Sequence, residues 1–250
     1  MSRARTGVEI AIVLGLSLGL SALYSVVNIL VRLTRDTPLS EQTATLNASR
    51  SPLPWADFSY QVLGIVQGLV PVALVIFLLW SSAQPRLGKL GLDGKRWASD
   101  GPAGVGLAAL IGIPGLGVYL VGRELDLTVN VIPTALNTYW WTVPMLIALA
   151  MKAGIVEEII AVGYLFARLR EMAVPVWAII VLQAFLRGTY HLYQGFGAFV
   201  GNVAMGLVFG FIYARTGRLA PLIIGHAVID TVVFVGYPLT ADLLGNFSES

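Results

Sequence analysis

Long apolar runs separated by short polar segments dominate this chain. Seven runs cover residues 8–31, 58–80, 102–121, 139–168, 174–192, 197–214 and 219–235. A stretch of about 20 mainly apolar residues is long enough for a helix to cross the hydrocarbon core of a bilayer. The pattern therefore predicts an all-α fold, a polytopic membrane bundle of about seven transmembrane helices.

The composition agrees with a membrane protein. Of the 250 residues, only 12% are charged and 56% are hydrophobic, with a mean hydropathy of +0.78. Ordinary soluble domains carry about 25% charged residues, and a soluble domain of this length would need the charged surface that is missing here. The net charge of +2 gives no indication of nucleic-acid binding. Because the chain contains no cysteine, disulfides, thiolate metal sites and cysteine nucleophiles are excluded.

The polar segments between the runs predict the organisation of the chain. The segment 32–57 contains three prolines and is expected to be an external loop, and Pro114 is expected to kink the third helix. Trp140 and Trp141 are expected at the membrane interface, where aromatic residues are frequent. We expect an N-terminal three-helix region with polar loops, a four-helix core and a polar tail, over residues 1–138, 139–238 and 239–250.

The basic residues predict the orientation in the membrane. With a cytoplasmic N-terminus, ten basic residues lie inside and four outside, as the positive-inside rule expects. We therefore expect a multi-pass protein of the cell membrane. The inside residues are Arg3, Arg5, Arg86, Lys89, Lys95, Arg96, Arg168, Arg170, Arg215 and Arg218, and the outside ones are Arg32, Arg35, Arg50 and Arg123.

Six ionisable side chains interrupt three of the last four runs. A charged residue at the bilayer centre costs about 2.5–3.5 kcal/mol on insertion scales, so such residues usually face the protein interior and are often functional. Two of the pairs are spaced four residues apart, which places the members of each pair on one helix face. We therefore expect the six groups to converge on one interior cavity. They are Glu157 and Glu158, Arg187 and His191, and His226 and Asp230.

Each of these groups also has a structural interpretation. Arg187 and Glu158 would form an ion pair that serves packing alone, and Asp230 would only orient His226. Counted along straight helices at about 1.5 Å per residue, His191 and His226 should differ in depth by about 14 Å, which opposes convergence. Three further polar residues are read as interfacial or interhelical hydrogen-bonding groups, namely Tyr193, Gln194 and Asn202.

Three short motifs occur in order on these runs. The first is Glu157-Glu158 followed by Val162-Gly163, the second runs from Arg187 through His191, and the third is His226 with Asp230 four residues later. Together they resemble the motifs of the CAAX-protease and bacteriocin-processing family (CPBP, or Abi), over about residues 142–235.

Two positions depart from the pattern of that family. Val162 stands where the family usually has Arg, and Arg187 stands where it usually has Phe. One hypothesis is that the positive charge moved from the fourth helix to the fifth and kept its carboxylate partner, Glu158.

The resemblance implies an intramembrane endopeptidase, similar to CAAX prenyl proteases, that hydrolyses a membrane-associated peptide or protein. By position, Glu157 would be the general base, and His191 would hold the water and protonate the leaving amine. His226, positioned by Asp230, would stabilise the oxyanion. Glu158 and Arg187 would support the site. A metal-dependent version would use Glu157, His191 and His226 as zinc ligands.

Other functions remain open. A non-catalytic membrane scaffold or a bacteriocin-immunity-type protein could share the fold, and a proton-coupled transporter could also use buried Glu and His side chains. No internal repeat of the transporter kind is found in the sequence. The expected partners are membrane lipid and a peptide or protein substrate, and nucleic acid is not expected.

Overall fold

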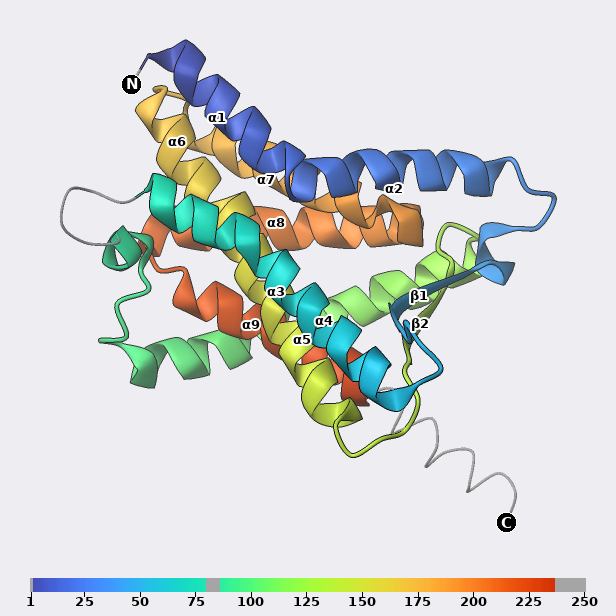
Figure 1. The fold of residues 1–250 in the computed structure, drawn as a ribbon. Coiled ribbons are helices and arrows are strands. Elements are labelled where there is room, and N and C mark those ends of the chain that lie inside the picture. The colour runs from blue at the N-terminus through green and yellow to red at the C-terminus, as the bar shows by residue number, and fades with distance from the viewer. Residues whose placement is uncertain (1, 80–85, 237–250) are drawn as a thin grey trace.

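Helices make up most of the computed structural model, which describes residues 2–79 and 86–236 (Figure 1). Short 3-10 turns occur at Leu39–Glu41, Arg86–Leu90 and Leu192–Gln194, and π-helical segments at Glu158–Tyr164 and Val232–Gly236. The α-helices are α1 (Arg3–Gly15), α2 (Leu18–Leu33), α3 (Pro54–Leu78), α4 (Trp97–Glu124), α5 (Thr142–Glu157), α6 (Leu165–Glu171), α7 (Val176–His191), α8 (Phe196–Thr216) and α9 (Ala220–Thr231).

Every predicted apolar run contains helix within the described residues. Three helices, α3, α4 and α8, are long and apolar enough to cross a membrane, and α1 with α2 would be a fourth span if this bent pair counts as one. The predicted helix ends are correct to within a few residues. Trp80, the predicted end of the second helix, lies outside the described residues, as does the predicted polar tail at 239–250.

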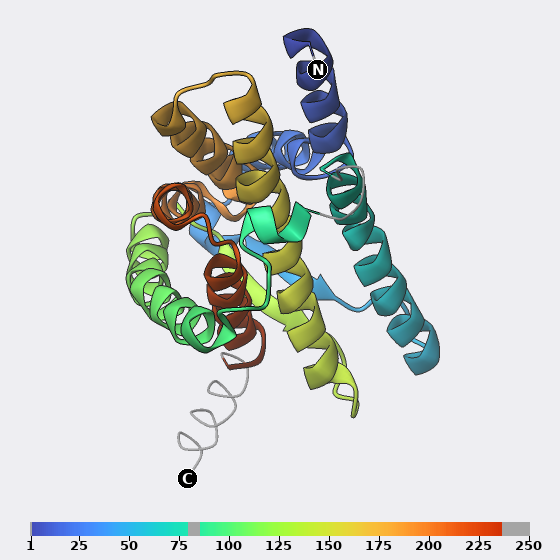
Figure 2. The same cartoon turned by 90° about the vertical axis from the view of Figure 1, so that its left-hand side faces the viewer.

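The first predicted helix is broken into two. α1 and α2 meet at a bend of 57°, where the backbone of Ser17 leaves the helical region. The Ser17 hydroxyl donates a hydrogen bond to the carbonyl of Val13 at 2.6 Å. Glycine and serine near a helix break are a usual cause of kinks, and here Gly15 and Gly19 flank the serine. α4 continues through Pro114 and is curved (Figure 2).

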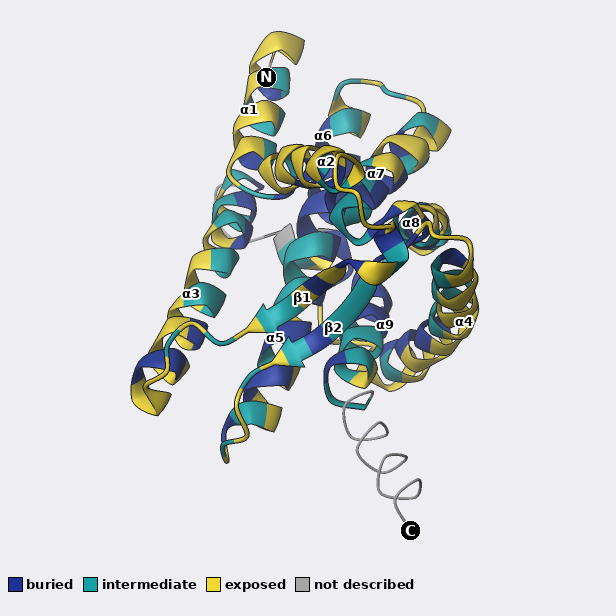
Figure 3. Ribbon diagram, turned by 90° about the vertical axis from the view of Figure 1, so that its right-hand side faces the viewer, coloured by how far each residue is buried: buried dark blue, intermediate teal, exposed yellow. Residues whose placement is uncertain are grey.

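A small β-sheet adds to the expected all-helical fold. Strands β1 (Thr43–Ala48) and β2 (Asn130–Ala135) pair in parallel, with Thr43 opposite Asn130 (Figure 3). Both strands lie in segments predicted as loops between helices. The sheet is joined to the end of α7 by an antiparallel bridge between Thr128 and Gly195 and by a 3.1 Å hydrogen bond from Val129 N to Gln194 O.

The column formed by α5, the π segment and α6 lies at the centre of the bundle. Figure 2 shows it between α3 on one side and α4 and α9 on the other. All seven residues of the segment Glu158–Tyr164 are buried. Gly206 allows α8 to lie close against α7, because an added Cβ there would clash with Ala184.

The two tryptophans predicted at the membrane interface differ in exposure. Trp140 is 86% exposed, but Trp141 is 5% exposed and packs against Phe58 and Tyr139. Trp141 was therefore wrongly predicted as an interfacial residue, because the turn before α5 points its side chain into the core.

Arg168 contacts α1 and α3 at the α6 end of this column. Arg168 contacts Glu9 of α1 at 2.7 Å and donates to the carbonyl of Leu78 at 2.8 Å. Tyr164 donates to the same Glu9 carboxylate at 3.0 Å. α1, α3 and α6 are thus fixed to one another by one buried guanidinium.

Candidate active site

Side chains from the second and third motifs lie around one carboxylate oxygen of Glu157. Tyr190 donates a hydrogen bond to its Oε2 atom at 2.7 Å. Three nitrogen atoms lie slightly further from the same oxygen, at 3.6 Å, 3.8 Å and 3.9 Å. They are His191 Nε2, Arg187 Nη1 and His226 Nε2, in that order.

Glu158 is the fully buried member of the carboxylate pair. Its Oε1 atom lies 2.5 Å from Nη2 of Arg187 and 2.7 Å from Nδ1 of His226, so one oxygen contacts both side chains. Arg187 is also fully buried. The ion pair that the sequence suggested between Glu158 and Arg187 is therefore present, and it also contacts the second histidine.

The local backbone explains how two successive glutamates can both lie in one buried group of side chains. Glu157 ends α5 and Glu158 begins the π segment. Successive helical residues point about 100° apart, so neither side chain needs to face lipid if helices pack on both sides. Here α7 supplies Arg187 and α9 supplies His226, and both helices pack against this column. π-helical turns are frequent at functional sites.

Asp230 lies on the other side of the His226 ring. Its Oδ2 atom is 3.6 Å from Nε2, which is beyond a hydrogen bond, whereas Glu158 is within hydrogen-bonding distance of Nδ1. Glu158 therefore holds the imidazole, and Asp230 faces the same nitrogen as Glu157 does.

His191 lies at the C-terminal end of α7, immediately before a 3-10 turn. Its Nδ1 atom is 3.4 Å from Gln194 Nε2, and Gln194 also donates to the Tyr193 hydroxyl at 2.9 Å. The Nε2 atom of His191 is buried and has no hydrogen-bond partner in the described part of the chain. Gln194 thus orients the ring, and the unpaired nitrogen points towards Glu157.

The structure brings all six predicted residues together. The estimated 14 Å difference in depth does not keep the two histidines apart, because both Nε2 atoms lie within 4 Å of Glu157 Oε2. Figure 1 shows α7 inclined to the α5–α6 column rather than parallel to it, so counting residues along straight, parallel helices does not show how close their side chains come. Asn202 is not part of the group, since it donates to Ala198 O of its own helix.

Tyr190 was missed by the sequence reasoning. It is 6% exposed, and its ring lies beside that of His191 with 4.8 Å between the centroids. The only sequence signal was its place beside His191 within the second motif. A tyrosine in an apolar helix is common in membrane proteins and gives no reason to single it out.

The predicted zinc set does not fit a metal ion. Within residues 2–79 and 86–236, no group of three or more His, Cys, Asp or Glu side chains could hold a metal. The oxygen that Glu157 would contribute already accepts a hydrogen bond from Tyr190 and lies 3.8 Å from the Arg187 cation. A permanent positive charge at this distance opposes the binding of a divalent cation.

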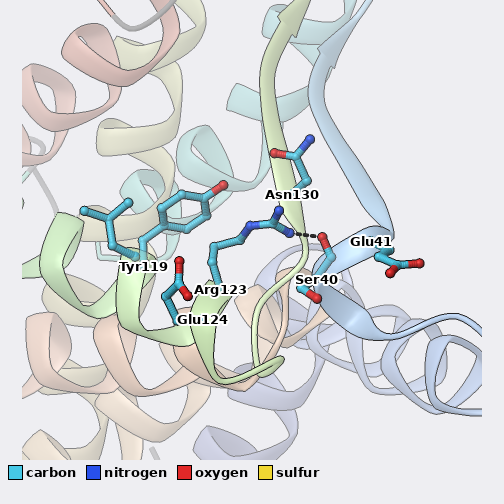
Figure 4. A pocket seen from close by; sticks show the side chains of 7 residues that line it. Ser40, Glu41, Tyr119, Arg123, Glu124 and Asn130 are labelled. Carbon is cyan, nitrogen blue, oxygen red and sulfur yellow. Dashed lines mark hydrogen bonds between the residues drawn. The ribbon is translucent and has the colours of Figure 1, made fainter.

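A surface hollow elsewhere contains none of the six residues. It has a volume of about 530 Å³ and lies between α4, β2 and the turn at Leu39–Glu41 (Figure 4). Arg123 donates to the carbonyl of Ser40 across it. The lining residues are Ser40, Glu41, Tyr119, Leu120, Arg123, Glu124 and Asn130.

Comparison with known proteins agrees with the motif resemblance. Residues 139–232 match the family model described as type II CAAX prenyl endopeptidase Rce1-like. No curated protein and no solved structure matches the chain. The matched range contains all six converging residues and Tyr190. This part of the chain is therefore similar to the Rce1-like family, which is consistent with the CPBP family and with the fold of a CAAX-type intramembrane protease.

Proposed function

We propose that this protein is an intramembrane endopeptidase that hydrolyses a peptide bond in a membrane-associated peptide or protein. The observation that carries the proposal is the convergence of Tyr190, His191, Arg187 and His226 on one oxygen of Glu157. An ion-pair network that serves packing alone, such as Arg187 with Glu158, needs no pair of imidazoles around a second carboxylate. The Rce1-like match supports the same reaction class.

Glu157 and His191 would activate water. His191 Nε2 is buried without a hydrogen-bond partner among the described residues, and it lies 3.6 Å from Glu157 Oε2, too far for a hydrogen bond, so it is free to hold a water molecule beside the carboxylate. Glu157 takes one proton from the water as the water oxygen bonds to the carbonyl carbon of the substrate. The tetrahedral intermediate then loses the amine, and the C–N bond breaks as that proton passes to the leaving nitrogen through His191.

His226 would stabilise the oxyanion of this intermediate. Its Nδ1 atom contacts Glu158, so the ring is held with Nε2 directed at the space beside Glu157. The Glu158 carboxylate is itself balanced by Arg187 at 2.5 Å. A positioned donor of this kind typically contributes a factor of about 10²–10³ to the rate of acyl transfer.

The membrane setting is part of the proposal. Seven spans with a cytoplasmic N-terminus would make the protein a multi-pass protein of the cell membrane, as the basic residues favour. A site inside the bundle then suits a substrate delivered from the lipid phase. A peptide with a prenylated C-terminus is the first substrate to test, because the matched family model is that of a CAAX prenyl endopeptidase.

The deciding experiment compares purified wild type, Glu157→Gln and Glu124→Gln in liposomes. Each receives a farnesylated CAAX peptide and an unprenylated copy, with and without a chelator. We expect cleavage by wild type and by Glu124→Gln, whose carboxylate lines the remote hollow, and none by Glu157→Gln. Cleavage by Glu157→Gln, or no cleavage of either peptide by wild type, would contradict the protease proposal and favour a non-catalytic membrane protein. Loss of activity with chelator would overturn the metal-free mechanism.

A further inference from the structure

Among the described residues, Tyr190 is the one side chain that makes a hydrogen bond of ordinary length to Glu157. Its hydroxyl lies 2.7 Å from Oε2, whereas the three nitrogen atoms around the same oxygen are 3.6–3.9 Å away. The tyrosine is buried, and its neighbour in sequence is His191. One turn of α7 therefore presents both a donor to the carboxylate and the imidazole beside it.

The two oxygens of Glu157 are in different environments. Oε2 is the atom that Tyr190, Arg187 and both histidines approach most closely. Oε1 accepts no hydrogen bond from any described residue, and it is not fully buried, so it remains accessible. The carboxylate thus has one fixed oxygen and one open oxygen.

We propose that Tyr190 is a positioning residue that fixes the rotation of the Glu157 carboxylate and so assigns proton abstraction to Oε1. This inference rests on the proposed protease function. Rotation about the last bond of a glutamate side chain is soft, so an unrestrained carboxylate would present either oxygen in many orientations. Arg187 cannot replace the hydroxyl, because its guanidinium lies closer to Glu158, at 2.5 Å, than to Glu157, at 3.8 Å.

The alternative is that Glu157 merely satisfies a buried tyrosine hydroxyl. In that case removal of the hydroxyl would change stability and leave turnover unchanged. The positioning role predicts the opposite result, because a misplaced base slows the chemical step without weakening substrate binding.

The test is steady-state kinetics on Tyr190→Phe in liposomes with the farnesylated CAAX peptide. Hydrogen bonds to a charged group contribute about 1.5–3 kcal/mol, which corresponds to a fall in kcat of roughly tenfold or more. KM should stay within about twofold, because the ring and its packing are retained. Tyr213→Phe is the matched control: its buried ring packs against Phe166 and is not part of the group around Glu157, so kcat should remain near wild type.

A second measurement does not depend on activity. The Tm of Tyr190→Phe is compared with that of wild type, and then in a Glu157→Leu background, where the acceptor is absent. If Tyr190 and Glu157 interact directly, Tyr190→Phe changes the Tm less in the Glu157→Leu background than in wild type. If kcat of Tyr190→Phe stays within twofold of wild type while Glu157→Gln is inactive, the positioning role is overturned and the protease proposal stands. If Glu157→Gln cleaves the peptide, both are overturned.

Discussion

Glu158 and His226 are joined through a 2.7 Å contact between Oε1 and Nδ1, although the residues are 68 positions apart. The same oxygen receives the Arg187 guanidinium. One buried carboxylate therefore connects a charge pair that stabilises the bundle with an imidazole that faces Glu157. Any change at Glu158 should affect both stability and activity, whereas a change at Glu157 should affect mainly activity.

Glu158→Gln should lower the free energy of unfolding by about 3–5 kcal/mol, because it leaves the Arg187 cation buried without its partner. Denaturant unfolding in detergent would measure the difference. Glu124→Gln, a carboxylate outside this network, is the control and should stay within about 0.5 kcal/mol of wild type. Equal behaviour of the two variants would show that the buried pair contributes nothing.

The exchange of Arg and aromatic positions between the two motifs can be tested by restoring the family pattern. Val162 is fully buried and lies four residues after Glu158 on the same segment. Arg187→Phe alone should impair folding, because it removes the cation beside Glu158. The double variant Val162→Arg, Arg187→Phe should recover folded protein, as judged by its yield and monodispersity in detergent. A double variant no better than the single one would rule out the exchange.

Asp230→Asn should be a mild change. Asp230 makes no hydrogen bond to His226 at its distance of 3.6 Å, and Glu158 holds the ring from the other side. We expect cleavage within a few-fold of wild type and unchanged stability, measured with the assay proposed above. A loss as complete as that of Glu157→Gln would mean that the Asp230 carboxylate itself takes part in the chemistry.

Glu9→Gln should loosen the first helix without touching the active site. Glu9 accepts from both Arg168 and Tyr164, and the loss of a hydrogen bond to a charged group costs about 1.5–3 kcal/mol. Limited proteolysis should therefore cut α1 faster, and peptide cleavage should persist. Glu171→Gln provides the comparison, since the Glu171 side chain is 49% exposed and its pair with Arg168 should contribute under about 1 kcal/mol.

Low pH should weaken the ion pair between Arg218 and Asp93, which lies just before α4. The guanidinium of Arg218 and the backbone N–H of Lys95 donate to Asp93 and lower the pKa of its carboxyl below the usual 3.8. A lowered pKa in the folded state gives stabilisation that is present above the unfolded value and is lost as the pH falls. The stability difference between wild type and Asp93→Asn should therefore be constant near neutral pH and should close below about pH 4. A gap that persists in acid would contradict this account.

The helices and the six clustered residues could be predicted because a bilayer limits the choices. Apolar runs of sufficient length must be helical, and ionisable groups within them must face inward. Glu158 with Arg187 followed from that argument. Tyr190 did not, because its role depends on which side chain faces it across the helix interface.

The sheet and the π segment could not be predicted for different reasons. β1 and β2 are short, β2 contains Pro133, and their pairing joins segments far apart in sequence. No local pattern indicates such a partner. In the π segment, Gly163 packs against Leu219 and Leu90 from other parts of the chain, and such tertiary contacts cannot be read from the local sequence. Trp141 was wrongly predicted for the same reason.

The parallel sheet also constrains the order in which the chain can be assembled. β1 is complete at Ala48, but its partner begins only at Asn130, after α3 and α4. The bridge from Thr128 to Gly195 further requires the end of α7. During synthesis, β1 can therefore pair only after α3 and α4 have followed it, and the contact of this region with Gly195 can form only once the chain has been made past the end of α7.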